Sequence, residues 1–86
     1  MASSYNSAVA IAASTSATNT ARNKGVMIVN NGGGATEADI NFTTPGGQAS
    51  SEVVIKGVTN HNPIIIPIRF YKTGGTQTNC TVYELT

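Results

Sequence analysis

The chain has 86 residues, a length that fits one small domain. Charged residues make up only 10% of it and the formal net charge is +1, so we do not expect the clustered basic surface that binds nucleic acid. No apolar run is long enough to cross a membrane as a helix, and a single cysteine, Cys80, excludes an internal disulfide. The composition therefore predicts partners other than nucleic acid or a membrane.

The choice of apolar residues favours β-structure. Eight Ile and seven Val accompany one Leu, and twelve Thr add further β-branched side chains. Such residues lose rotamer freedom in a helix and pack well on a pleated sheet. No segment has apolar residues at the spacing of an amphipathic helix. The sequence predicts an all-β fold, a small antiparallel β-sandwich or barrel of five to six strands with an extended N-terminal arm.

The predicted arm covers residues 1–23, a low-complexity segment of Ala, Ser, Thr and Asn, and the β-domain covers residues 24–86. The arm has too little apolar area to offset the entropy of ordering it, so we expect it to add nothing to the core. Val9 and Ile11 alternate, however, and could add a short strand to a sheet edge in this subunit or in another. A frayed terminus and a clamping arm are the two interpretations.

The first half of the β-domain contains two predicted strands. Residues 25–30 are apolar on both faces, which predicts a strand in a central position or at an interface. The Asn- and Gly-rich residues 30–34 predict a turn, because both residue types tolerate positive φ. Apolar and polar residues then alternate over residues 38–43 as in a half-buried strand. A proline and two glycines predict that this strand ends in a turn over residues 44–47.

The second half contains three further strands. The first covers residues 52–58, and a polar connection follows it. In residues 64–71 every second side chain is large and apolar, and Pro67 predicts an edge or a bulge because proline has no N–H to donate. Gly74 and Gly75 are expected to reverse the chain, and residues 78–85 form the returning strand.

No residues with catalytic chemistry are grouped in a motif. His61 lies in a loop without the partners that a metal site or a general base needs, unless copies of it meet on a rotation axis. Cys80 is interpreted as a small buried hydrophobe in a strand. Residues 32–34 lack the spacing of a phosphate-binding loop, and the four carboxylates are scattered along the chain. We predict that the protein is not an enzyme and has no cofactor and no metal site.

Three of the five basic residues, Arg22, Lys24 and Arg69, are candidates for a small positive patch. One interpretation is a solvated face without a specific role. The other is a set of ion pairs with an acidic neighbouring subunit.

The order of motifs resembles a family of small structural proteins of tailed bacteriophages and gene-transfer agents, described as head spike base or capsid-associated proteins. The resemblance lies in four segments and covers most of residues 7–85: Gly25–Val29, Ile55–Val58, Ile65–Arg69 and Thr73–Asn79. It implies an all-β virion protein, often multimeric, without catalytic residues.

The expected function is therefore that of a cement (decoration) protein or head spike base on the capsid exterior. Its partners would be the major capsid protein or other virion proteins and further copies of itself, with a trimer favoured. Because the N-terminal residues lack the basic region and hydrophobic block of a secretory signal, we expect synthesis in the host cytoplasm. The predicted contacts fall in two groups, the arm residues Tyr5, Val9 and Ile11 and an interaction face with Arg69, Tyr71 and Tyr83.

The alternative function is a receptor- or carbohydrate-binding module of a phage tail or spike. Such a module needs exposed aromatic platforms, and the chain has no Trp and three Tyr. A glycan-array signal from the isolated protein would favour this alternative.

Overall fold

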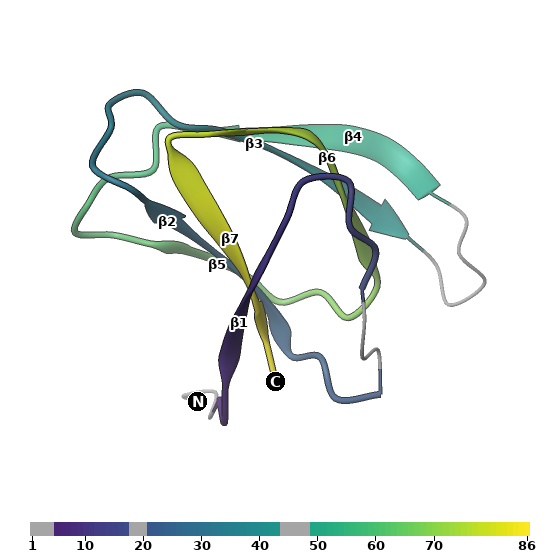
Figure 1. Ribbon diagram of the computed structural model, residues 1–86. Coiled ribbons are helices and arrows are strands. Elements are labelled where there is room, and N and C mark those ends of the chain that lie inside the picture. The colour runs from purple at the N-terminus through teal and green to yellow at the C-terminus, as the bar shows by residue number, and fades with distance from the viewer. Residues whose placement is uncertain (1–4, 18–20, 44–48) are drawn as a thin grey trace.

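The computed structural model describes residues 5–17, 21–43 and 49–86, and in the last of these ranges side chains from residue 53 onward. These described residues form seven strands (Figure 1): β1 Ala8–Ile11, β2 Gly25–Asn30, β3 Glu37–Thr43, β4 Ala49–Lys56, β5 Ile64–Ile66, β6 Tyr71–Thr78 and β7 Cys80–Leu85. The all-β prediction is confirmed, and the strands outnumber the five to six that were expected.

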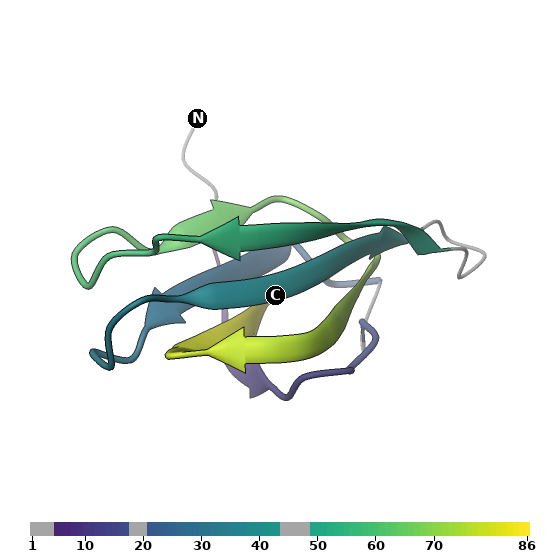
Figure 2. The ribbon, with the colours of Figure 1, turned by 90° about the horizontal axis from the view of Figure 1, so that it is seen from above.

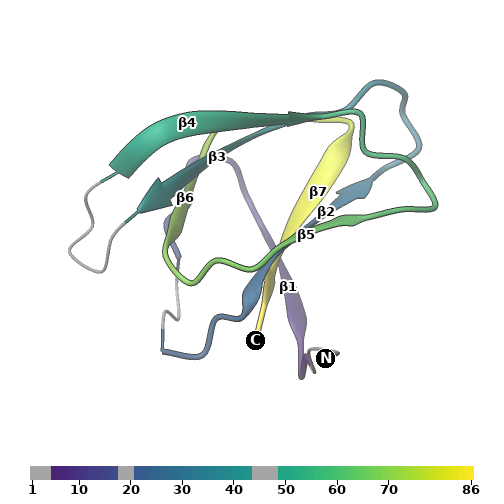
Figure 3. The same cartoon turned by 180° about the vertical axis from the view of Figure 1, so that it is seen from behind.

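The strands form two separate antiparallel sheets. One has the order β1-β7-β2-β5 and is called the four-stranded sheet below; the other has the order β4-β3-β6 and is called the three-stranded sheet. In Figure 2 the three-stranded sheet lies across the four-stranded one, and Figure 3 shows the same layers from behind. The described part of the chain is thus a sandwich and not a closed barrel, which decides between the two predicted architectures.

The core lies between the two sheets. Val26, Ile28 and Val82 of the four-stranded sheet are fully buried against Ile40 of the three-stranded sheet, as expected for β-branched side chains on facing inner surfaces. The buried cluster consists of Ile11, Val26, Ile28, Ala38, Ile40, Val58, Tyr71, Cys80 and Val82.

Two of the predicted strands are found where the sequence placed them. β2 begins and ends at the predicted residues and lies between β7 and β5, so its central position is confirmed. β3 covers the predicted alternating segment. β4 begins at Ala49 and ends at Lys56, so it starts and stops earlier than predicted. The turn predicted at 44–47 lies outside the described residues.

The single strand predicted for residues 64–71 is wrong. β5 ends at Ile66, and the chain then crosses from one sheet to the other and enters β6 at Tyr71. Pro67 cannot donate a ladder hydrogen bond, and the N–H of Ile68 turns back to the carbonyl of Ile66 at 2.9 Å. Pro67 was predicted at an edge or a bulge of that strand, but it lies in the crossover after β5, which is the outer strand of its sheet.

The predicted reversal at Gly74 and Gly75 is also wrong. Both glycines lie inside β6, at an irregularity of its pairing with β3. Gly74 allows a close approach there, because a Cβ on it would lie 2.6 Å from the Cβ of Asp39. The chain instead changes direction at Asn79, which has a φ of 54° and joins β6 in one sheet to β7 in the other.

The N-terminal segment takes part in both sheets. β1 pairs with β7, which makes it an edge strand within its own subunit. The next residues follow β6: the N–H of Ser14 donates to the carbonyl of Gly74 and that of Ala17 to the carbonyl of Tyr71, at 2.8 and 2.9 Å. Ile11 belongs to the core cluster. The expectation that the residues before 23 add nothing to the core is therefore wrong.

Candidate interaction surface

The side of the four-stranded sheet that faces away from the core carries a row of apolar residues. Strand register places Ala10 opposite Tyr83, Tyr83 opposite Met27, and Met27 opposite Ile65, so one row crosses all four strands. Directly opposed residues share a face, and this row alternates with the buried row that contains Ile28. The outward positions of this sheet, named the apolar outer face below, are Ala8, Ala10, Met27, Val29, Ile65, Thr81 and Tyr83. Register puts Gly25 and Leu85 on the same side, but both are buried within the molecule.

None of these outward positions is charged, because the sheet's one charged residue turns inward. Glu84 is the only acidic or basic residue in β1, β2, β5 and β7. It is 4% exposed and accepts a hydrogen bond from the Tyr71 hydroxyl at 2.6 Å. The two residues come from different sheets, so this polar contact joins the two layers inside the sandwich.

Tyr71 was predicted on an interaction face, and this prediction is wrong. The residue opens β6 on the inner face of the three-stranded sheet and is 1% exposed. Its burial, followed by its hydrogen bond to the Glu84 carboxylate and the charge of that group, raises the pKa of the Tyr71 hydroxyl. A protonated hydroxyl donating to a carboxylate explains how both groups are buried at acceptable cost.

The outer side of the three-stranded sheet is different in character. Glu37 and Lys56 lie opposite each other on β3 and β4 and form an ion pair at 3.7 Å. Asp39 and Lys72 lie on the same side by alternation from the buried Ile40 and Thr73. An exposed apolar residue, Val54, accompanies them.

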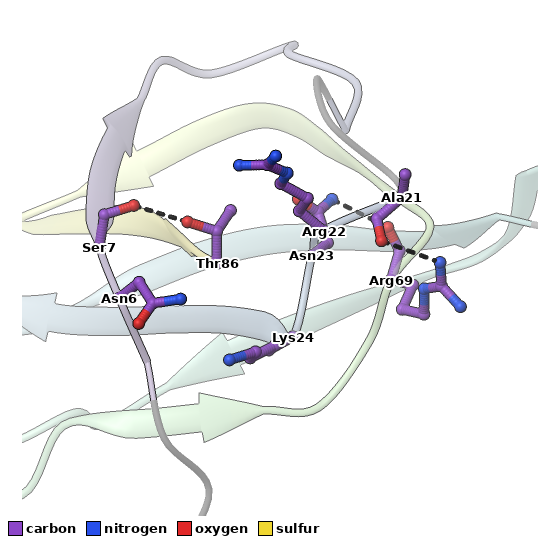
Figure 4. A pocket seen from close by; sticks show the side chains of 8 residues that line it. All are labelled: Asn6, Ser7, Ala21, Arg22, Asn23, Lys24, Arg69 and Thr86. Atoms are coloured by element: carbon purple, nitrogen blue, oxygen red, sulfur yellow. Dashed lines mark hydrogen bonds between the residues drawn. The ribbon is translucent and has the colours of Figure 1, made fainter.

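A cavity of about 600 Å³ opens beside the end of the four-stranded sheet where β2 begins and β7 ends. It is named the basic cavity below, and Figure 4 shows its lining: Asn6, Ser7, Ala21, Arg22, Asn23, Lys24, Arg69 and Thr86. The three basic residues that the sequence suggested as a patch are therefore brought together. None of the described residues that line the cavity is acidic.

Hydrogen bonds to main-chain carbonyl groups hold the walls of the basic cavity. The side-chain amide of the buried Asn23 donates to the carbonyl of Arg69 at 3.0 Å, and a guanidinium nitrogen of Arg69 donates to the carbonyl of Ala21 at 3.4 Å. The N–H of Lys24 donates to the carbonyl of Leu85 at 2.8 Å. These bonds fix residues 21–24 against the crossover that follows β5 and against the last strand.

The other predicted contact residues have different positions. Tyr5 and Val9 are 37% and 57% exposed, and Tyr83 lies on the apolar outer face. Ile11 is buried in the core, so the structure corrects its prediction as an arm contact. Sequence reasoning missed Met27 and Ile65 as members of the surface. The signal for Met27 was present in the two apolar faces predicted for residues 25–30.

The residues weighed for chemistry lie apart. His61 is exposed in a loop, and Cys80 is a buried free thiol whose pKa is raised by that burial. Within the described residues, no three His, Cys, Asp or Glu side chains gather as metal ligands. The same part of the chain contains no helix long and apolar enough to span a bilayer.

Comparison with known proteins adds no relative: no protein family, curated protein or solved structure matches this chain.

Proposed function

We propose that this protein is a structural subunit of a phage virion, which binds the outside of the capsid as a cement protein or head spike base. The observation that carries the proposal is the apolar outer face, on which no outward position of four paired strands is charged. Charged residues are depleted in the centre of protein interfaces, whereas Tyr and Met are enriched there. The sequence resemblance to capsid-associated proteins supplies the class of partner.

The mechanism is additive and mechanical. Each copy covers apolar surface of the shell with this sheet, and the cost of desolvating the face is low because none of its side chains is charged. Ser7 and Thr86 close the end of β1 against β7 with a hydroxyl contact of 2.6 Å, so the edge of the sheet is tied down. Tyr5 and Val9 are the exposed large apolar residues of the N-terminal segment. Val9 lies opposite Glu84, so it is on the other side of β1 from the apolar outer face.

Burial of Tyr71 weakens the case for a carbohydrate-binding module. Glycan recognition by such modules depends on exposed aromatic rings, and one of the three tyrosines in the chain is in the core. The virion role needs no such platform.

Two exposed apolar residues, one on each sheet, allow a matched test. Ile65 is 46% exposed on the apolar outer face and Val54 is 42% exposed on the three-stranded sheet. We expect Ile65→Lys to lower occupancy on shells of the source phage's major capsid protein at least tenfold, as measured by sedimentation and quantitative gel analysis. Val54→Lys should load within twofold of the wild type. Equal loading of the two variants, or no loading of the wild-type protein, would contradict the proposal.

A further inference from the structure

We propose that two copies of this protein pair through the outer edge of β4, in antiparallel register about a twofold axis at Val54, so that their three-stranded sheets join into one continuous sheet. The partner is therefore a second copy of the same chain. The inference goes beyond the proposed function and does not depend on it, because that function uses the outer face of the other sheet.

The outer edge of β4 is the first argument. The strand covers Ala49–Lys56, has eight residues, and within the described part of the chain is hydrogen-bonded to one neighbouring strand only, β3. In Figure 2, β4 is the outermost strand of the three-stranded sheet. An edge of this kind presents unpaired N–H and C=O groups, which makes it a template for a further strand.

The other strand edges in the described residues are covered or short. On the free side of β6, the N–H of Ser14 donates to the carbonyl of Gly74, and the N–H of Thr73 donates to the carbonyl of Thr15, both at 2.8 Å. The edge strands of the other sheet, β1 and β5, have four and three residues, and Pro67 follows β5. Short strands and proline are devices that limit edge pairing, so β4 is the edge best able to accept another strand.

The sequence of β4 is self-complementary about Val54. Directly opposed residues share a face, so a twofold axis of two paired strands passes through one residue of each copy. With the axis at Val54, the acidic Glu52 lies opposite the basic Lys56 of the second copy, and this pair occurs twice. Opposite charges in that position stabilise a pair of strands, whereas like charges destabilise it. An axis at Glu52 would oppose two acidic residues, and one at Val53 or Ile55 would leave Glu52 and Lys56 unmatched.

The exposed and buried positions of β4 fit the same register. Val54 is 42% exposed and the Lys56 side chain is 68% exposed on the outer side of the three-stranded sheet. Ile55 packs against the core cluster on the inner side. The axis therefore brings two exposed valines together on one face, and the pairing leaves the core of each copy closed.

The pairing should be weak between free copies. It involves five residues a side, whereas a standard interface involves about 20–30, so we expect a dissociation constant on the order of 1 mM. The twofold axis is perpendicular to the joined sheet, so both four-stranded sheets lie on the same side of it. The two apolar outer faces then point the same way, and two paired copies can contact one surface.

The first test traps the register with cysteines in the full chain at 200 µM, on a Cys80→Ala background. In glutathione disulfide, Val54→Cys should form a covalent dimer at least tenfold faster than Lys56→Cys, because only residue 54 meets its own copy within the reach of a disulfide. An equimolar mixture of Glu52→Cys and Lys56→Cys should form the mixed dimer at least fivefold faster than either variant dimerises with itself. Equal rates for Val54→Cys and Lys56→Cys, or no excess of the mixed dimer, would overturn the proposal.

The second test leaves Cys80 in place and compares backbone amide shifts by NMR at 50 µM and 2 mM. The wild type should show concentration-dependent shifts at residues 52–56. Glu52→Lys opposes like charges and should reduce these shift changes at least threefold, and Glu52→Lys/Lys56→Glu, which exchanges the two charges, should recover at least half of them. The pairing is wrong if the wild type shows no change at these residues, or if the double variant recovers nothing.

Discussion

The outer surfaces of the two sheets differ more than their inner ones. Glu37, Asp39, Lys56 and Lys72 lie on the outer side of the three-stranded sheet, whereas no charged residue projects from the apolar outer face of the other. Both inner surfaces contribute buried apolar side chains to one core cluster. Low average charge in this chain is therefore not a uniform property of its surface. The few charges are placed so that one broad face remains without them.

This contrast is the basis for proposing the apolar outer face as the contact surface. A sheet with one charged and one apolar side needs no partner beyond the core, because water solvates its outer side. A sheet that is apolar on both sides has a second face that only another molecule can cover. The predictions below test that contrast, beginning with the largest expected effect.

The two faces of β2 should respond differently to truncation. Ile28→Ala removes a fully buried side chain and leaves a cavity, so we expect it to lower the free energy of unfolding by about 2–5 kcal/mol. Met27→Ala changes the outer face of the same strand and should cost about 1 kcal/mol or less. Urea denaturation of both variants measures the difference. Equal losses would mean that the outer face is already covered in the isolated protein, and the contrast would fail.

A substitution of Tyr71, the hydrogen-bond partner of Glu84, tests whether this bond holds the Glu84 side chain inside the sandwich. Tyr71→Phe removes the hydroxyl that donates to the carboxylate at 2.6 Å, and the loss of a hydrogen bond to a charged group should cost about 1.5–3 kcal/mol. Chemical denaturation at pH 7 gives this value. A cost below about 0.5 kcal/mol would mean that Tyr71 does not hold Glu84 inside the sandwich.

The same pair predicts a pH dependence. The pKa of Tyr71 is raised in the folded protein from an ordinary value of 10.0, chiefly by burial, so the folded state keeps its proton where the unfolded chain has lost it. The free energy of unfolding should therefore be unaffected by this group below about pH 10 and fall above it, by up to about 1.4 kcal/mol per pH unit. Tyr71→Phe should lack this decline. An identical decline in the variant would assign it to other groups.

The charged outer side contains a close backbone approach that a pair of glycines can test. A Cβ on Gly74 would lie 2.6 Å from the Cβ of Asp39, whereas a Cβ on Gly75 would meet no atom within 4 Å. Gly74→Ala should therefore destabilise the protein by about 1–3 kcal/mol, and Gly75→Ala should have an effect near zero. Thermal unfolding of the two variants gives the comparison. Equal effects would argue against the packing of β6 on β3 at this point.

Much of the fold could be predicted from the sequence, and the predictions that were wrong have physical causes. Alternation placed β2 and β3 correctly because each strand has an inner row of large apolar residues. Gly74 and Gly75 were expected to form a turn because their conformational freedom permits one, but their use here depends on contact with Asp39 on a distant strand. Local sequence does not contain that contact.

The surface was harder to predict than the core. Tyr71 and Tyr83 have similar sequence neighbourhoods, yet one is buried and one lies on the outer face, because the chain changes sheet at Asn79 between them. Arg22, Lys24 and Arg69 were recognised as a set by their charge alone. The cavity that joins them depends on the crossover after β5, which the sequence placed inside a longer strand.

The smallest expected effect is that of two mild substitutions, which test whether the apolar outer face is uncovered when the protein is alone. Ile65→Thr and Val54→Thr change residues of similar exposure on the two sheets, and each should alter the free energy of unfolding by about 0.5 kcal/mol or less in a monomer. If copies associate through the outer face, folding and association are linked, and the stability of the wild type rises with protein concentration. Ile65→Thr would then remove that concentration dependence while Val54→Thr would not. Denaturation at 5 and 200 µM therefore distinguishes a face kept for the shell from one that a second copy already covers.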